Sequence, residues 1–252
     1  MNLRIVTPEL LVDISTLPEL RGIKDDGGYI RIGAAVRYQE ILASPIVAAN
    51  VPLLLEALRL VAHVAIRNRG TLGGSLAFAD PAAELPACAV ALDATIHIAS
   101  RGGRRMLPAA EFFTGMMSNA LQVGELIESV TFPKIAPTAV TAILELSRRQ
   151  GDYAMAGVVA TAMIAEGKIS QARIVFFGCT SHARRAVAVA RVLEGAVLPL
   201  PEATNLQLAS AVEQDIDPSD SPGCSATTRS KLAITLMKRI VGTLAERVRP
   251  IS

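Results

Sequence analysis

The spacing of hydrophobic residues changes near residues 133–137, and this change divides the chain in two. Before it, short stretches that alternate between apolar and polar residues predict strands, and apolar residues at helical spacing predict helices. The predicted strands are 29–34, 94–99, 105–108 and 126–132, and the predicted helices are 38–43, 52–66, 82–91 and a short one from residue 109. A first domain is therefore expected over residues 1–135.

Longer elements follow the change in spacing. Three strands are predicted at 140–147, 156–165 and 169–177, and three helices at 183–195, 201–213 and 225–248. Consecutive strands followed by helices are typical of an α+β fold, in which the helices pack on one face of the sheet. A second domain is expected over residues 138–252.

The composition indicates a well-packed globular protein and argues against several functions. Of the 252 residues, 51% are hydrophobic, and the net charge is only +2. Basic residues are scattered and only 4% of residues are aromatic, so no nucleic-acid surface is expected. No apolar run is long enough to span a bilayer and the first twenty residues contain no signal-peptide core, so we expect a cytoplasmic protein with no membrane span.

The chain contains no arrangement of residues typical of a catalytic or metal site. Cys88, Cys179 and Cys224 are far apart, so neither an iron–sulfur cluster nor structural zinc is expected in this chain. No Gly-x-Ser-x-Gly or His-Glu-x-x-His motif is present. Any chemistry would therefore belong to a bound cofactor.

One glycine-rich stretch is the most informative part of the sequence. Gly70, Gly73 and Gly74 lie next to Thr71, Leu72 and Ser75. Exposed amides in such a turn, together with Thr and Ser hydroxyls, form a concave anion site that suits a diphosphate. The alternative from spacing alone is an ordinary glycine turn.

The wider stretch resembles one protein family. Its residues are Ile-Arg-Asn-Arg-Gly-Thr-Leu-Gly-Gly-Ser-Leu-Ala from residue 66, Asp-Pro-Ala-Ala-Glu-Leu-Pro from 80 and Ala-Leu-Asp-Ala from 91. They resemble the FAD-binding medium subunit of molybdenum hydroxylases, the group of carbon monoxide dehydrogenase and xanthine dehydrogenase. Further matches at residues 1–4, 11–14, 151–154 and 217–220 extend the resemblance over essentially the whole chain.

The resemblance implies a fold and a set of binding residues. The fold would be a truncated FAD-binding domain of the PCMH type, followed by a three-stranded sheet packed with helices that serves as a docking domain. Thr71, Leu72, Gly73, Gly74 and Ser75 would contact the FAD diphosphate. Glu84 would lie near ribose hydroxyls, Ile127 would turn its backbone to the flavin, and Tyr153 would lie against the isoalloxazine ring. The alternatives are a surface or helix-terminal Glu84, a core Ile127 and a half-buried Tyr153.

The resemblance also implies a function and partners. A molybdopterin large subunit would oxidise a small substrate, an iron–sulfur small subunit would pass the electrons on, and FAD in this chain would deliver them to an external acceptor. The family's first FAD loop, Ala-Gly-Gly-x-Ser-[LT], would precede Met1, so the chain is expected to lack it and to bind FAD more weakly. Two alternatives stay open: a flavin-free assembly subunit, or a stand-alone FAD-linked oxidoreductase of the same broad fold.

Overall fold

The first part of the chain is built on a five-stranded antiparallel sheet in the order β1-β2-β7-β3-β4. The computed structural model describes residues 9–248, so the matching residues 1–4 lie outside it. The strands are Ile23–Asp26 (β1), Tyr29–Gly33 (β2), Thr95–Ser100 (β3), Gly103–Pro108 (β4) and Leu126–Pro133 (β7). The four strands predicted in this part are thus confirmed, with shifts of one or two residues at their ends.

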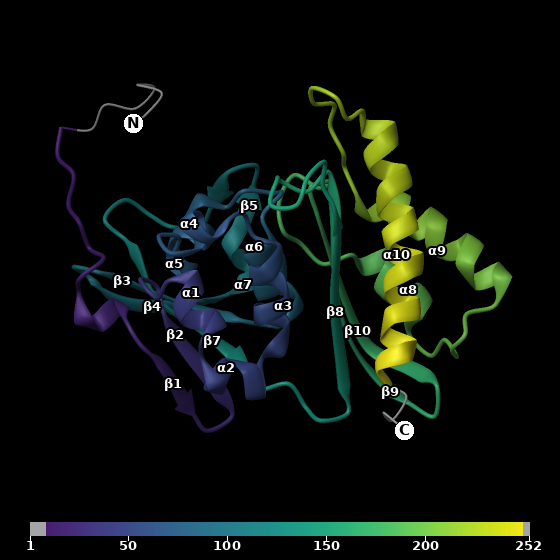
Figure 1. Cartoon of the computed structure of the whole chain (residues 1–252), viewed down its shortest axis with the longest axis horizontal. Helices are drawn as coiled ribbons and strands as arrows, with labels where there is room; N and C mark the ends of the chain where they lie inside the picture. Colours follow the sequence, from purple (N-terminus) through teal and green to yellow (C-terminus); the bar gives the residue numbers. More distant parts are fainter. Residues whose placement is uncertain (1–8, 249–252) are drawn as a thin grey trace.

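Short helices cover one face of this sheet (Figure 1). They are Tyr38–Leu42 (α1), Pro45–Asn50 (α2), Pro52–Leu60 (α3), Val64–Arg67 (α4), Leu72–Phe78 (α5), Glu84–Ala91 (α6) and Ala109–Phe112 (α7). Alternate strand residues such as Ile30, Ile32 and Val130 are fully buried beneath them. Burial of these apolar side chains is the main stabilisation of this layer.

The second part is a three-stranded antiparallel sheet with three helices, as the sequence predicts. The strands are Ala139–Leu146 (β8), Ala156–Ala165 (β9) and Lys168–Phe177 (β10), in the order β10-β9-β8. The helices are Val187–Leu193 (α8), Glu202–Asp215 (α9) and Ala226–Val248 (α10). They pack on one face of the sheet, where Leu236 and Ile240 of α10 meet Val158 and Phe176.

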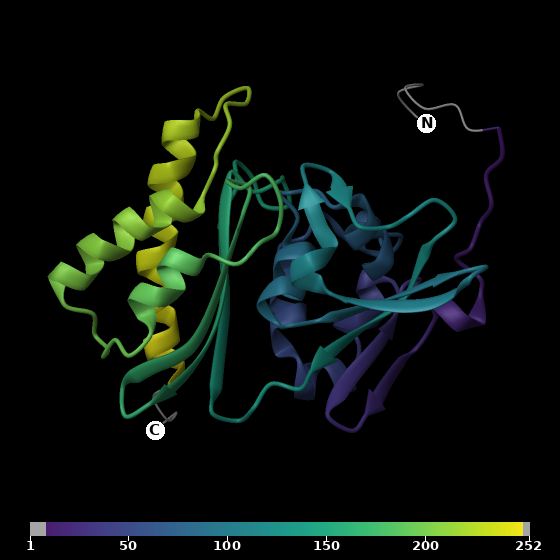
Figure 2. The ribbon, with the colours of Figure 1, turned by 180° about the vertical axis from the view of Figure 1, so that it is seen from behind.

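The other face of the three-stranded sheet packs on the first part. Ile143, Val159 and Phe177 share a hydrophobic core with residues of α3 and α6. Figures 1 and 2 show β8 to β10 standing between α3 and α6 on one side and the three later helices on the other. The two parts therefore form one continuous packed structure, and the surfaces that meet at their junction are available to build a site.

The predicted helix 52–66 is interrupted, which corrects the prediction. Helix α3 ends at Leu60, Ala62 adopts φ +40°, and α4 starts at Val64. Arg67 Nη1 donates to the carbonyls of Val61 (2.8 Å) and Ala62 (2.7 Å), which lie between the two helices. The apolar spacing continues through the break, so the periodic pattern gives no sign of it.

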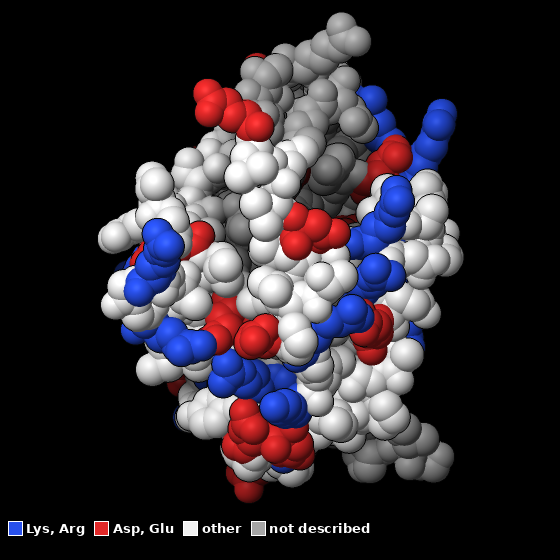
Figure 3. All heavy atoms as spheres, turned by 90° about the vertical axis from the view of Figure 1, so that its left-hand side faces the viewer, with Lys and Arg blue, Asp and Glu red and all other residues white. Residues whose placement is uncertain are grey.

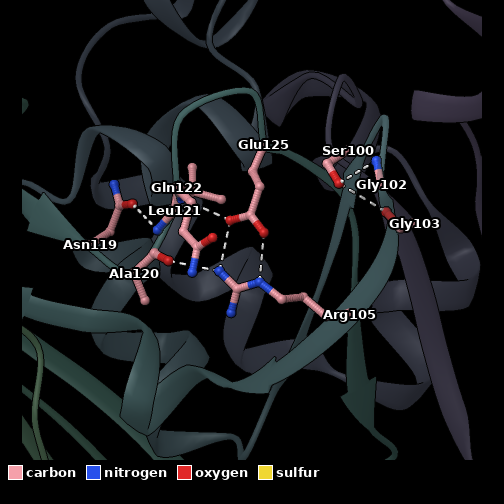
Figure 4. Close-up of polar contacts among 9 residues, drawn as sticks. All are labelled: Ser100, Gly102, Gly103, Arg105, Asn119, Ala120, Leu121, Gln122 and Glu125. Atoms are coloured by element: carbon pink, nitrogen blue, oxygen red, sulfur yellow. Dashed lines mark hydrogen bonds and ion pairs between the residues drawn. The ribbon is translucent and has the colours of Figure 1, made fainter.

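A small hairpin, strand β1 and helices α2 and α5 were not predicted. Phe113–Gly115 (β5) pairs with Ser118–Asn119 (β6), and Ser44 caps the unpredicted helix α2 through a bond from the Val47 amide to its Oγ. The loop after β6 is fixed by Arg105, whose Nε and Nη2 each lie 2.7 Å from a carboxylate oxygen of Glu125 (Figure 4). The same Nη2 also donates to the Ala120 carbonyl at 2.8 Å.

Charges of both signs are interspersed on the surface. On the face shown in Figure 3, Lys and Arg side chains lie among Asp and Glu side chains. This face therefore carries charges of both signs. Elsewhere in the described part, opposite charges also pair: Glu128 accepts from Arg104 Nη2 at 2.9 Å and lies 3.5 Å from Arg31 Nη2.

Candidate functional site

A cavity of about 440 Å³ lies at the junction of the two parts. Its walls come from α4, α5 and the start of α6 on one side, and from residues 151–153 on the other. Five of the eight predicted site residues line it: Thr71, Gly74, Ser75, Glu84 and Tyr153. Leu72, Gly73 and Ile127 are not among its lining residues.

The glycine-rich stretch is the beginning of a helix. Thr71 is the N-cap of α5, and its Oγ1 accepts a hydrogen bond from the Gly74 amide at 3.2 Å. The Leu72 and Gly73 amides donate to the carbonyls of Val36 (3.1 Å) and Ala34 (2.8 Å). The expectation that successive amides of this turn are free to bind an anion is therefore wrong for Leu72 and Gly73, because both amides already donate to backbone carbonyls.

Two of the glycines have different structural roles. A Cβ at Gly73 would lie 2.5 Å from the Ala34 Cβ, so only glycine allows α5 to lie this close to the chain after β2. A Cβ at Gly74 would meet only the Thr71 Oγ1, at 2.8 Å. Gly73 thus holds the turn in place, while Gly74 keeps the wall of the cavity open above the Thr71 hydroxyl.

Glu84 is a buried acid at the back of the cavity. It is the first residue of α6 and is only 9% exposed, so the surface alternative is wrong and the helix-terminal one is correct. Burial, with smaller contributions from the Glu145 and Asp80 carboxyls, raises the pKa of its carboxyl to about 8. A carboxyl in this position can accept or donate hydrogen bonds, depending on its protonation.

Tyr153 lies at the rim of the cavity rather than half-buried on a strand end. It is 70% exposed and belongs to the loop between β8 and β9. Arg229 holds the end of this loop, because its Nη1 donates to the Met155 carbonyl at 2.7 Å. Ile66 and Phe78, which also line the cavity, are more than half exposed. These three side chains form an apolar rim suited to a flat aromatic ring.

Leu72 and Ile127 lie in the core next to the site and do not line the cavity. Leu72 is fully buried, and Ile127 is 5% exposed and pairs with Ile98 in the sheet. The Ile127 side chain therefore lies in the core, and a contact of its backbone with the flavin stays a prediction.

Several lining residues were missed, Arg69 and Tyr38 among them. Arg69 precedes the first glycine and was available in the sequence as a cation beside a predicted anion site. Tyr38 packs its ring on Gly70, where a Cβ would lie 2.4 Å from the ring, and nothing in the local sequence indicates this contact.

The described residues were also compared with the requirements of a metal site and of a membrane-spanning helix. No group of three or more His, Cys, Asp or Glu side chains within residues 9–248 is placed to hold a metal ion. Among the helices of these residues, none combines the length and apolar character needed to cross a membrane.

Comparison with known proteins identifies relatives over the whole chain. The 6-hydroxypseudooxynicotine dehydrogenase complex subunit alpha of Paenarthrobacter nicotinovorans is 37% identical over 251 residues, which cover 99% of this chain and 84% of the relative. The glyceraldehyde dehydrogenase medium chain of Sulfolobus acidocaldarius is 33% identical, over 94% of this chain and 84% of the relative.

Solved structures of related dehydrogenases are also similar to this chain over almost its whole length. A carbon monoxide dehydrogenase of Hydrogenophaga pseudoflava, which lacks the Mo-pyranopterin moiety of its cofactor, superposes with a TM-score of 0.94 at 33% identity. The match covers 98% of this chain and 85% of that chain.

Family matches divide between the two parts of the chain. Residues 1–135 match the FAD binding domain in molybdopterin dehydrogenase, and residues 141–244 match the CO dehydrogenase flavoprotein C-terminal domain. With the relatives and the fold, these matches show that the chain belongs to the family of FAD-binding medium subunits of molybdenum hydroxylases, a family of oxidoreductase subunits whose cofactor is FAD.

Proposed function

We propose that this chain passes electrons from the iron–sulfur clusters of a small subunit to an external acceptor, by means of FAD held in the cavity between α5, α6 and residues 151–153. A large subunit carrying molybdopterin would oxidise the substrate. The names of the relatives, a complex subunit and a medium chain, support a place in a multi-subunit enzyme. The observation that carries the proposal is one cavity whose lining combines hydroxyl and cationic donors with exposed apolar side chains.

The residues of the cavity fit the two chemical halves of FAD. Thr71 and Ser75 supply hydroxyl donors, and Arg69 supplies a cation, for the diphosphate. Glu84, which has no ion-pair partner among the described residues, suits the hydroxyl-rich part of the molecule. Leu72, Gly73 and Ile127 contribute indirectly, because they fix the turn and the sheet beneath the cavity.

FAD, when bound, takes up electrons in pairs and releases them singly, while the protein supplies binding, orientation and shielding. Tyr153, Ile66 and Phe78 would cover the flat ring and exclude water from it. Because Tyr153 is exposed and lies on a loop, its side chain is the part of the rim best placed to move when an acceptor approaches.

The test is the visible absorbance of the full chain, purified with and without added FAD and passed through gel filtration. Retained flavin absorbance that falls in the Ser75→Ala variant supports the cavity as the FAD site. An exposed serine outside the cavity, Ser118, provides the matched Ser→Ala control. A colourless chain that still binds iron–sulfur and molybdopterin subunits would instead identify a flavin-free assembly subunit.

A further inference from the structure

Two acidic residues from different parts of the chain are turned toward the junction behind the cavity. Glu84 begins α6 and lines the cavity. Glu145 lies on β8, two residues after Ile143, and therefore on the sheet face that packs against the first part of the chain. Its Oε2 is buried and has no hydrogen-bond partner among the described residues.

The surroundings of Glu84 contain acids and phenols but few cations. The titratable groups that act on it or line the cavity with it are Asp80 before α6, Glu145 on β8, Cys88 one turn along α6, Tyr38 on α1, and Asp152 and Tyr153 from the loop after β8. Of the described residues that line the cavity, Arg69 alone is cationic, and no ion pair joins it to Glu84.

A buried carboxyl without a cation is stable mainly in its protonated form, because burial disfavours the charge. Burial raises the pKa of Glu145 to about 7, as it raises that of Glu84 to about 8. The charge on Glu145 also disfavours ionisation of Glu84, so the protonation of the two carboxyls is coupled. Near neutral pH the pair therefore retains a proton, which it releases as the pH rises.

We propose that Glu84 and Glu145 form a buried proton-binding site that takes up a proton from solvent when an anionic dinucleotide enters the adjoining cavity. This inference rests on the proposed function, because it takes FAD as the ligand. The FAD diphosphate brings negative charge toward a region where acids outnumber cations. A nearby negative charge favours the protonated form of a carboxyl, so binding shifts the pair toward protonation.

The sign of the pH dependence follows from this linkage. At about pH 6, below both pKa values, the pair already holds most of its protons, and FAD affinity should depend little on their uptake. Above about pH 8, each further pH unit should weaken FAD binding by up to about tenfold, as long as a full proton must be taken up.

The experiment is isothermal titration calorimetry of the full chain with FAD, in buffers of different ionisation enthalpy, at pH 6 and pH 8.5. The dependence of the heat on the buffer gives the number of protons taken up. We expect about one proton per FAD at pH 8.5 and close to none at pH 6. Glu84→Gln and Glu145→Gln should each reduce the uptake at pH 8.5, whereas Glu111→Gln, an exposed control outside the cavity, should leave it unchanged.

A second readout does not need the ligand. In the infrared spectrum of the free chain, a carbonyl band of a protonated carboxylic acid should be present at pH 7, weaken as the pH rises above 8, and decrease in Glu84→Gln. FAD binding with the same heat in every buffer, or the absence of this band, would overturn the inference and leave the proposed function standing. Failure of the unaltered chain to bind FAD at either pH would overturn both.

Discussion

Arg247 in the last turn of α10 forms a bidentate ion pair with Glu56 of α3, with Nη1 and Nη2 at 2.8 and 2.9 Å from the two carboxylate oxygens. Arg247 Nη1 also donates to the Thr141 carbonyl on β8. One side chain near the end of the chain therefore connects the outer helix, the middle sheet and the first part of the structure.

Replacing Arg247 by Ala should weaken the junction between the two parts. Both side chains are partly exposed, so solvent screening limits the loss in the free energy of unfolding to roughly 1 kcal/mol. Urea unfolding of the full chain measures it. Arg239→Ala, on the exposed face of the same helix, is the matched control and should change stability less. Equal effects of the two substitutions would contradict a specific role for the Arg247 ion pair.

The Gly73→Ala substitution should destabilise the chain and reduce FAD retention together. The added Cβ would lie 2.5 Å from the Ala34 Cβ, so α5 must shift away from β2, at a cost of about 1–3 kcal/mol. Gly242→Ala is the control, because a Cβ at this helical position meets nothing within 4 Å and should stabilise α10 by about 0.5–1 kcal/mol. Unchanged thermal stability of Gly73→Ala would show that the turn is looser than the structure indicates.

Thr71→Val should lower both helix stability and FAD affinity, whereas Thr71→Ser should preserve them. Valine keeps the shape of the side chain but removes the Oγ1 that accepts a hydrogen bond from the Gly74 amide. Loss of such a helix cap costs about 1 kcal/mol of stability. The same change removes a hydroxyl from the cavity wall. Thermal unfolding and FAD titration of both variants separate the two effects. A Val variant that binds FAD as tightly as the Ser variant would exclude a ligand contact by the hydroxyl.

Acid should release the loop after β6. The Arg105 hydrogen bonds lower the pKa of Glu125 from its ordinary 4.5 to about 2. A lowered pKa in the folded state means that this contribution to stability is complete above about pH 4.5 and is lost as the pH falls through about 2. Glu125→Gln should make the fall in thermal stability over this range shallower. Glu213→Gln, an exposed control on α9, should retain the slope of the unaltered chain.

Much of the fold could be predicted because each element carries its own periodic signal. Strand β9 and helix α10, for example, are long and strongly patterned, and both were predicted within a residue or two of their ends. The division at residues 135 and 138 remains a prediction. The core is continuous across it, since Ile143 and Phe177 pack with α3 and α6.

The parts that could not be predicted depend on contacts distant in sequence. The break at Ala62 is held by Arg67, whose bonds to carbonyls leave no trace in the spacing of apolar residues. The Gly73 amide donates to Ala34, which is nearly forty residues earlier, so its engagement could not be known from the motif. Likewise, the burial of Glu84 depends on the sheet face that carries Glu145.

The two walls of the cavity are far apart in the order of synthesis. Residues 66–84 leave the ribosome well before residues 151–153, and the rim loop is anchored by Arg229, which emerges later still. A nascent chain therefore carries half a site until residues 151–153 and Arg229 have been synthesised. Premature termination or clipping after the first part would leave a chain that lacks residues 151–153 and cannot close the rim around its ligand.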